Sequence, residues 1–279
     1  MSSLQQSDIR RVPVATRSSF YTAMRILPPA QREAMFGVYA FCRAVDDIAD
    51  DGGPAQERLA ALDQWRRDID RLYAGSGETL LTERLQSTIE AYGLAQTDFL
   101  AVIDGMEMDL RRDMRAPNWQ TLDLYCDRVA SAVGRLSVRI FGLQETDGLL
   151  LAHHLGRALQ LTNILRDLDE DAVMGRLYLP REALTEAGIA HQDIAKVLAD
   201  PSLDKACGIV AGRARGHFDA AESIMARCGR NNVRSPRLMA AVYRPMLDKL
   251  VSRGWRPPRH KLRHSTPLII WAVLRHGLL

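Results

Sequence analysis

Hydrophobic residues along this chain recur every three or four positions, which is the spacing of amphipathic helices. Between residues 56 and 74, for example, Leu59, Leu62, Trp65 and Ile69 fall on one helical face. Alternation with a period of two is not sustained, and no Asn-Gly or Asp-Gly pair joins two alternating segments as in a hairpin. The pattern therefore predicts an all-α protein. Helices are expected at about 28–51, 56–74, 79–92, 97–114, 119–142, 146–173, 202–228, 234–253 and 262–276.

Glycine and proline residues separate these segments, but no long linker or internal repeat divides the chain. We therefore expect one helical domain over residues 1–279, with residues 1–15 as a flexible tail. Gly208, Gly212 and Gly216 recur every fourth residue within one predicted helix. Because a glycine inside a helix costs about 1 kcal/mol relative to alanine, we interpret them as a place where another helix packs closely.

Composition narrows the class of protein. The 279 residues are 47% hydrophobic and 25% charged, which suits a globular protein with a large core. A net charge of +3 and an aromatic content of 6% argue against nucleic-acid binding. The four cysteines show neither metal-ligand spacing nor a disulfide framework, and the N-terminus lacks the apolar core of a signal peptide. We expect a reduced, cytoplasmic setting.

The longest apolar run, residues 267–274, is too short to span a membrane. Two interpretations stay open: a final helix packed on the core, or an apolar tip in peripheral contact with the inner face of the membrane. The seven histidines form no HExxH motif or other ligand set, and His153-His154 is interpreted as a pair on a helix surface without a catalytic role.

Two acidic segments carry the candidate chemistry. They are residues 43–51 (RAVDDIADD) and 163–171 (NILRDLDED), and each has aspartates at positions i and i+4. On a helix this spacing places both carboxylates on one face, one turn apart. Mg²⁺ prefers carboxylate, water and phosphate oxygens as ligands. Two such helices facing each other could hold several Mg²⁺ ions over a cavity.

The alternative interpretation is that these acids form solvated helix faces. Both segments lie near the ends of predicted helices, where carboxylates oppose the helix dipole and repel each other. Apolar residues surround both segments, and Arg43 and Arg166 precede the aspartates. Arginine beside metal-binding acids suits a diphosphate, whose oxygens accept bidentate hydrogen bonds. The arrangement therefore favours a metal–diphosphate site.

Four segments carry a resemblance to a known family: SSFYTAMRILP (18–28), YAFCRAVDDIAD (39–50), YCDRVASAVGRLSVRIFG (125–142) and LGRALQLTNILRDLDEDAVMGRLYLP (155–180). Over residues 18–255 the chain resembles the squalene/phytoene synthases, which have an all-α isoprenoid synthase fold around a central apolar cavity. Residues 105–117, 124–142 and 271–278 are most similar to the bacterial enzymes that make presqualene diphosphate for hopanoid synthesis.

The resemblance implies a role for each matching residue. The expected ligands of two or three Mg²⁺ ions bridging to diphosphate are Asp46, Asp50, Asn163, Asp167 and Asp171. Catalytic roles are implied for Tyr125, Arg43 and Arg166. The expected substrate contacts are Ser18, Ser19, Phe20, Tyr39, Arg43, Gln160, Arg166, Arg176, Tyr178 and Tyr243. The small residues that follow Tyr125 would form a wall that leaves room for two prenyl chains: Ala130, Ser131, Ala132 and Gly134.

The implied reaction joins two farnesyl diphosphates head to head, giving presqualene diphosphate and free diphosphate without a nicotinamide cofactor. Tyr125 and the released diphosphate are the candidate proton acceptors, and other enzymes of the pathway are candidate partners. Three enzymatic alternatives stay open: a phytoene synthase acting on geranylgeranyl diphosphate, a squalene synthase that continues with a hydride, and a terpene cyclase or head-to-tail prenyl transferase. A non-enzymatic alternative is an inactive helical assembly factor.

Overall fold

The computed structural model describes residues 23–50, 52–76, 80–111, 113–190, 193–260 and 262. The all-α prediction is confirmed: these residues contain no strand, only one isolated bridge between Arg115 and Leu177. The elements are α2 (Pro29–Asp50), α3 (Ala55–Tyr73), α4 (Leu80–Tyr92), α5 (Gln96–Arg111), α6 (Trp119–Cys126), the π-helix η2 (Asp127–Ser131), α7 (Ala132–Ile140), α8 (Glu145–Arg166), α9 (Leu168–Val173), α10 (Arg181–Ala187), α11 (Ile194–Ala199), α12 (Leu203–Arg227) and α13 (Arg234–Arg253).

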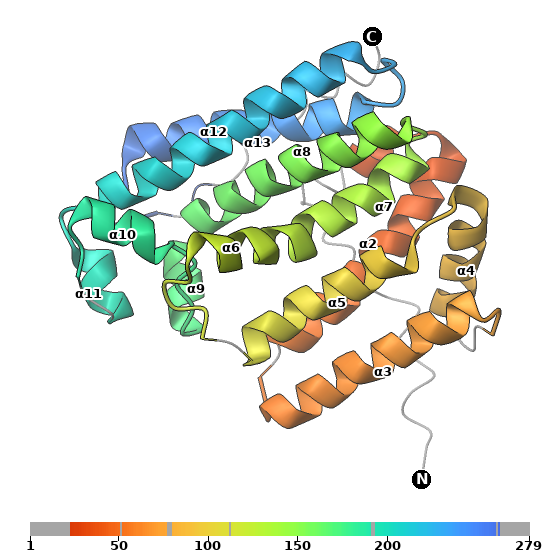
Figure 1. Cartoon of the computed structure of the whole chain (residues 1–279), viewed down its shortest axis with the longest axis horizontal. Helices are drawn as coiled ribbons and strands as arrows, with labels where there is room; N and C mark the ends of the chain where they lie inside the picture. Colours follow the sequence, from red (N-terminus) through yellow and green to blue (C-terminus); the bar gives the residue numbers. More distant parts are fainter. Residues whose placement is uncertain are drawn as a thin grey trace.

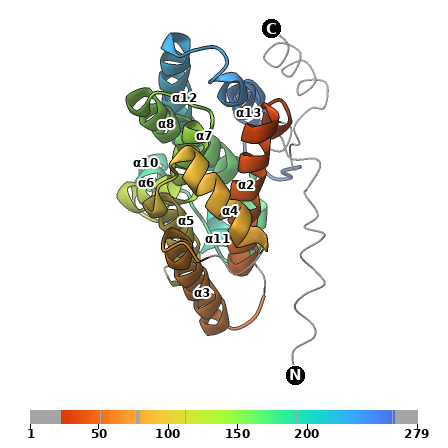
Figure 2. The ribbon, with the colours of Figure 1, turned by 90° about the vertical axis from the view of Figure 1, so that its right-hand side faces the viewer.

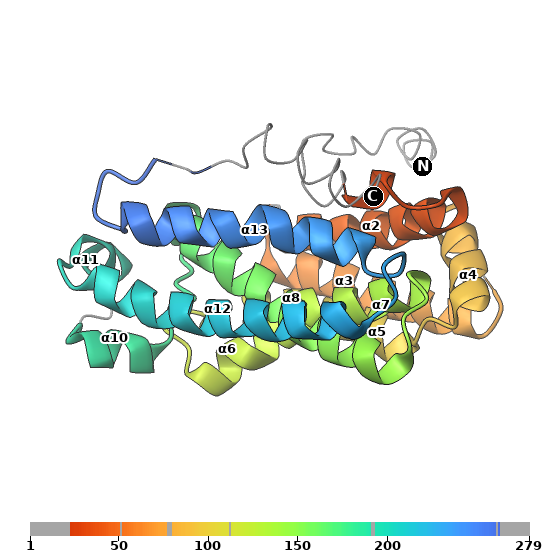
Figure 3. The ribbon, with the colours of Figure 1, turned by 90° about the horizontal axis from the view of Figure 1, so that it is seen from above.

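Helix α8 is the central element of the bundle. It contacts α7, α12 and α13, and also α6, η2 and α9 (Figure 1). From above, α12 and α13 run beside each other along α8 (Figure 3). Helices α12 and α3 lie at opposite ends of the stack, with α5 next to α3 (Figure 2). The position of α8 lets it present one face to α7 and another to α12.

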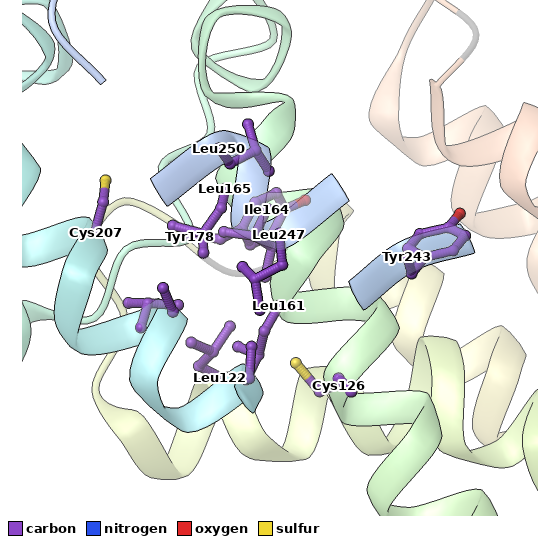
Figure 4. Packing of buried hydrophobic residues seen from close by; sticks show 14 of the residues in the cluster. Leu122, Cys126, Leu161, Ile164, Leu165, Tyr178, Cys207, Tyr243, Leu247 and Leu250 are labelled. Carbon is purple, nitrogen blue, oxygen red and sulfur yellow. The ribbon is translucent and has the colours of Figure 1, made fainter. Parts of the chain in front are cut away.

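Two clusters of buried side chains form the core. One joins α8, α12 and α13, where Leu161, Leu165 and Leu247 pack together (Figure 4). The other joins α2, α3, α5 and α7 around Phe41, which meets Phe99 edge to face at 5.1 Å. Val129 and Leu143 pack against both clusters, so the two are continuous through the η2–α7 segment. Among the described residues, no helix combines the length and apolarity needed to cross a bilayer.

The wide turn η2 interrupts the helix predicted at 119–142 where it passes between α5 and α8. A Cβ on Gly105 would lie 2.6 Å from Val129, and one on Gly156 would lie 2.8 Å from the Cα of Ser131. Both helices therefore approach η2 within a distance that only glycine permits. π-helical turns of this kind are frequent at functional sites.

The structure differs from the sequence prediction in three details. The helix predicted at 146–173 ends at Arg166 and restarts at Leu168, because Asp167 has φ −104° and ψ 20°. Two short helices, α10 and α11, were not predicted, because neither is long enough to show a hydrophobic period. The three glycines of α12 pack against nothing: a Cβ on any of them would find no atom within 4 Å among the described residues. The buried residues of α12 are others, among them Ala206, Val210, Ala214 and Phe218.

Several expected features lie outside the described residues. These are the tail over residues 1–15, the substrate contacts Ser18, Ser19 and Phe20, and all but residue 262 of the helix predicted at 262–276.

Candidate active site

A cavity of about 350 Å³ runs along the antiparallel pair formed by α7 and α8. At one end its walls are apolar, with Phe141 and Val138 facing Leu151. At the other end they are polar, with Gln160 and Asn163. Asn163 lies twelve residues after Leu151, which corresponds to about 18 Å of helix rise. The cavity thus has the shape and polarity gradient that suit a long apolar chain with a charged head group.

Small residues on one wall create much of this space. Ala130 and Gly134 line the cavity from η2 and α7, as expected, and Ser137 of α7 lines it as well. Ser131 and Ala132, also expected in that wall, are instead fully buried in packing. The cavity wall therefore follows one face of the segment.

Helix α2 supplies the other polar groups at the mouth. Tyr39, Arg43 and Asp46 line the cavity, and Tyr243 reaches it from α13. The Arg43 guanidinium donates to Asp46 at 2.9 Å and to Asp47 at 2.6 Å. Six predicted site residues therefore border one hollow: Tyr39, Arg43, Asp46, Gln160, Asn163 and Tyr243.

The side-chain oxygen of Asn163 is suited to bind a ligand. Its Oδ1 is buried and has no hydrogen-bond partner among the described residues. Leaving a buried acceptor unpaired costs about 1–3 kcal/mol, and such groups are rare in folded proteins. Asn163 and Asp46 both line the cavity, and an unpaired oxygen there fits a site for a metal ion.

The electrostatics of the acids show that the two segments converge. Burial raises the pKa of Asp46 to about 6, and the charge of Asp50 adds to this effect. Burial also raises the pKa of Asp171 to about 7, with Asp167 as the next contributor. The charge of Asp109 raises the pKa of both Asp46 and Asp171, so one acid lies near both segments. Such a concentration of carboxylates fits a site for divalent cations.

Two arginines, Arg166 and Arg176, form ion pairs with aspartates of the two acidic segments. Arg166 pairs with Asp167 through its Nε at 2.8 Å, and Tyr243 is among the groups that raise its pKa. Arg176 reaches back to α2, donating to the Asp50 carboxylate at 2.9 Å and to the Ala49 carbonyl at 3.2 Å. Arg176 thereby ties the end of α2 to the segment that follows α9.

The most informative residue that sequence reasoning missed is Asp109 on α5. Its side chain is only 4% exposed. It accepts hydrogen bonds from Tyr125 at 3.0 Å and from Tyr178 at 2.7 Å, and the two tyrosine rings stack with centroids 4.9 Å apart. Arg176 lies 4.0 Å from the same carboxylate. Burial, followed by the charge of Asp109, raises the pKa of Tyr125, which is therefore a neutral phenol.

Two backbone contacts hold this network in position. The Leu177 amide donates to the Met114 carbonyl at 3.1 Å, and the Ala116 amide donates to the Leu177 carbonyl at 2.8 Å. This pairing fixes the neighbouring Arg176 and Tyr178 against α5. Near the second acidic segment, the indole of Trp255 donates to the Leu165 carbonyl at 2.7 Å and so satisfies a carbonyl at the end of α8.

The predicted residues therefore form two adjoining groups. Tyr39, Arg43, Asp46, Gln160, Asn163 and Tyr243 line the cavity, whereas Asp50, Tyr125, Asp167, Asp171, Arg166, Arg176 and Tyr178 lie outside its lining and are linked through Asp109 and Arg176. Arg176 and Asp50 connect the two groups. Arg176 donates a hydrogen bond to Asp50, and Asp50 lies one helical turn beyond Asp46 on α2.

An all-helical bundle with an apolar cavity beside a cluster of aspartates is the arrangement of an isoprenoid synthase. The squalene/phytoene synthase family model matches residues 14–267. The chain belongs to the squalene/phytoene synthase family, as its sequence resemblance implies.

Known relatives and structures agree with this assignment. The chain is 58% identical to a presqualene diphosphate synthase of Sinorhizobium fredii over 89% of each chain. It is 54% identical to that of Zymomonas mobilis, over 94% of this chain and 89% of the other, and 34% identical to a 15-cis-phytoene synthase of Synechococcus elongatus, over 77% and 73%. The fold matches a squalene synthase of Alicyclobacillus acidocaldarius with a TM-score of 0.78 at 30% identity, covering 85% of this chain and 89% of that one.

Proposed function

We propose that this protein joins two farnesyl diphosphates head to head to give presqualene diphosphate and free diphosphate, within hopanoid synthesis. The observation that carries the proposal is the cavity that leads from converging acids to an apolar end. The relatives with 54–58% identity are presqualene diphosphate synthases, which supports this product over the phytoene of the relative at 34%.

Divalent metal is proposed as the cofactor, with Mg²⁺ as the ion. Asp46 and Asp50 of the first acidic segment and Asn163, Asp167 and Asp171 of the second would hold two or three ions. The orphaned Asn163 oxygen and the raised pKa values of Asp46 and Asp171 support this fit. When bound, Mg²⁺ supplies positive charge to the leaving diphosphate.

The arginines complete the diphosphate site in this proposal. Arg43 lies on the cavity, and Arg166 and Arg176 flank the second acidic segment. Each now pairs with an aspartate, and each guanidinium keeps further N–H groups for diphosphate oxygens. The apolar walls exclude water from the allylic cation that forms when diphosphate leaves. Tyr39, Gln160 and Tyr243, which line the cavity, would contact the substrates.

The proton that leaves as the cyclopropane closes needs an acceptor. Tyr125 is a poor base because it is a neutral phenol. We propose that Asp109 accepts the proton, with Tyr125 and Tyr178 relaying it along their hydrogen bonds to the carboxylate. Burial raises the pKa of Asp109, which improves its match to a general base near neutral pH.

A cytoplasmic location with peripheral contact to the inner face of the membrane is also proposed. Val173 is 89% exposed and Met174 45% exposed, at the end of α9 beside the second acidic segment. Exposed apolar side chains at this position suit contact with a lipid surface.

The test is product analysis by mass spectrometry after incubation of the purified protein with Mg²⁺ and farnesyl diphosphate, with and without NADPH. A C30 diphosphate is expected in both cases. A hydrocarbon that forms only with NADPH would indicate a squalene synthase, and faster conversion of geranylgeranyl diphosphate would indicate a phytoene synthase. Folded protein that gives no product with either substrate would overturn the proposal.

A further inference from the structure

Three histidines meet on the face of α8 that turns away from the cavity. His153 and His154 come from α8 and His217 from α12, and one ligand atom of each lies within 4.8 Å of the others. The Nδ1 atoms of His154 and His217 are 3.0 Å apart. None of the three lines the cavity or belongs to the acidic segments.

The nitrogens of His154 and His217 have a spacing close to that of a metal site, and His153 would have to move closer to complete it, because the three ligand atoms are spread over as much as 4.8 Å. Two zinc–nitrogen bonds of about 2.0–2.1 Å at a tetrahedral angle place the nitrogens roughly 3.3 Å apart. A small tilt of either ring would bring the His154 and His217 nitrogens to this separation. In the metal-free protein a proton must lie between two nitrogens this close, and a metal ion would take its place.

The surroundings of the cluster keep the rings available as ligands. Burial lowers the pKa of His153 and His154, and it lowers that of His217 to about 4. All three imidazoles are therefore neutral near pH 7, the form that binds metal. His154 and His217 are half-buried, so their rings are already held in place by packing.

The charges near the cluster also permit a cation. Arg157 lies one turn from His153, but its guanidinium is bound by Asp123 at 2.7 Å and by Asp127 at 3.2 Å. Arg135 pairs with Asp127 and with Asp98 in the same network. Three carboxylates against two guanidiniums leave a net charge of −1. The charge of Asp123 acts on His153 and His217, but the charge of Arg157 acts on all three histidines in the opposite direction and more strongly. The imidazole nitrogens, and not nearby carboxylates, would therefore hold a cation.

We propose that His153, His154 and His217 form a site for a divalent transition metal of the zinc class, which cross-links α8 to α12. Three imidazoles and one open position make up a donor set that suits Zn²⁺, Ni²⁺ or Cu²⁺ and not the hard ion Mg²⁺. The site is separate from the acids that would hold Mg²⁺. Its role is to fix α8, whose other end carries Asn163, against α12.

The proposal is tested on the full-length protein in excess Mg²⁺, which occupies the acidic segments. Titration with Zn²⁺ is expected to show one tight equivalent per chain and to raise Tm by about 5 °C at a hundredfold excess over Kd. Titration with Co²⁺ should give the visible absorption bands of a tetrahedral nitrogen site. Further Mg²⁺ added to the Mg²⁺-saturated protein should produce neither effect, because the acidic segments are already occupied.

His217→Ala is expected to weaken Zn²⁺ binding at least about 100-fold, the upper limit for loss of a group that only supports a ligand. His260→Ala, at an exposed histidine outside the cluster, is the matched control and should bind like the wild type. Equal Zn²⁺ binding by His217→Ala and the wild type would overturn the proposal. The wild-type Co²⁺ spectrum decides the matter if His217→Ala does not fold, because absence of tetrahedral bands contradicts the site by itself.

Discussion

At the scale of single residues, Asp171 in the second acidic segment carries a charge that the fold disfavours. The pKa of Asp171 is raised to about 7, mainly by burial and then by Asp167. Between its ordinary pKa near 4 and about 7, the folded state therefore binds more protons than the unfolded state. Without metal, stability must fall as pH rises through this range. Such a loss of stability in the absence of metal is expected of a site that binds a cation.

Asp171→Asn tests this relation. In the absence of divalent ions the variant should be more stable than the wild type at pH 8, by about 1–2 kcal/mol after allowance for partial exposure. The difference should shrink toward pH 4, where both side chains are neutral. Urea unfolding at the two pH values measures it. An equal effect at both would show that charge is not the cause.

A second residue-scale prediction concerns the proton acceptor. Asp109→Asn and Tyr125→Phe should each lower kcat by about 10²–10⁴-fold, and the double variant should lose little more than either single one because the two act as a unit. The pH profile of the wild type should show an acid limb, since protonated Asp109 cannot accept a proton, and Asp109→Asn should lose that limb.

Tyr73→Phe is the control for this pair, because the Tyr73 hydroxyl bonds to the Leu94 carbonyl away from the site. It should leave kcat close to the wild-type value. Additive losses in the Asp109 and Tyr125 variants would argue that the two groups do not share one proton path.

Sequence alone could locate the aspartate pairs, because the i, i+4 spacing and the flanking arginines are visible in the chain. It could not indicate Asp109. That carboxylate is a single acid without a motif, and its meaning comes from Tyr178, which lies 69 residues further along the chain. The histidine cluster was missed for the same reason, since His217 is 63 residues from His154.

At the scale of elements, close packing around η2 determines the shape of the cavity wall. Gly156 of α8 faces the backbone of Ser131 at a distance that excludes a Cβ. Gly212 of α12 has open space around it. The two glycines are chemically identical and differ only in their surroundings, so they form a natural pair for comparison.

Gly156→Ala should destabilise the protein by about 1–3 kcal/mol, because α8 must move away from η2. Gly212→Ala should instead stabilise it by about 0.5–1 kcal/mol through helix propensity alone. Chemical denaturation of both variants measures the two effects. Equal effects of the same sign would contradict the assigned packing.

The apolar end of the α7–α8 pair gives a further prediction. Phe141 borders the cavity at the end away from Asn163. Phe141→Ala should lengthen the cavity and raise the ratio of kcat/KM for geranylgeranyl over farnesyl diphosphate by about 10-fold or more, in line with the value of a few methylene groups in an apolar pocket. An unchanged ratio would place the tail elsewhere.

Helix positions were largely predictable from the hydrophobic period. The helices predicted at 56–74, 202–228 and 234–253 agree with α3, α12 and α13 to within one residue at each end. The break at Asp167 was not predictable, because the residues on both sides continue a helical pattern. There the chain turns so that Asp167 follows one helix and Asp171 falls in the first turn of the next, where the dipole favours acids.

At the scale of the whole molecule, the fold brings together the ends of α2 and α8, two helices far apart in the sequence. Arg176 joins them by binding Asp50, and Asp109 is near acids of both segments. We propose that the chain is one domain, because Val129 and Leu143 pack against both hydrophobic clusters. The resemblance indicated this convergence, whereas the sequence pattern alone did not.

The central claim is that the two acidic segments hold divalent cations jointly with a diphosphate. The most direct measurement is Mn²⁺ binding, followed by electron paramagnetic resonance, with an unreactive farnesyl thiodiphosphate. Wild-type protein should bind Mn²⁺ much more tightly when the analogue is present, and Asp46→Asn and Asp167→Asn should each lose that increase. Retention of the full increase by either folded variant would contradict the claim.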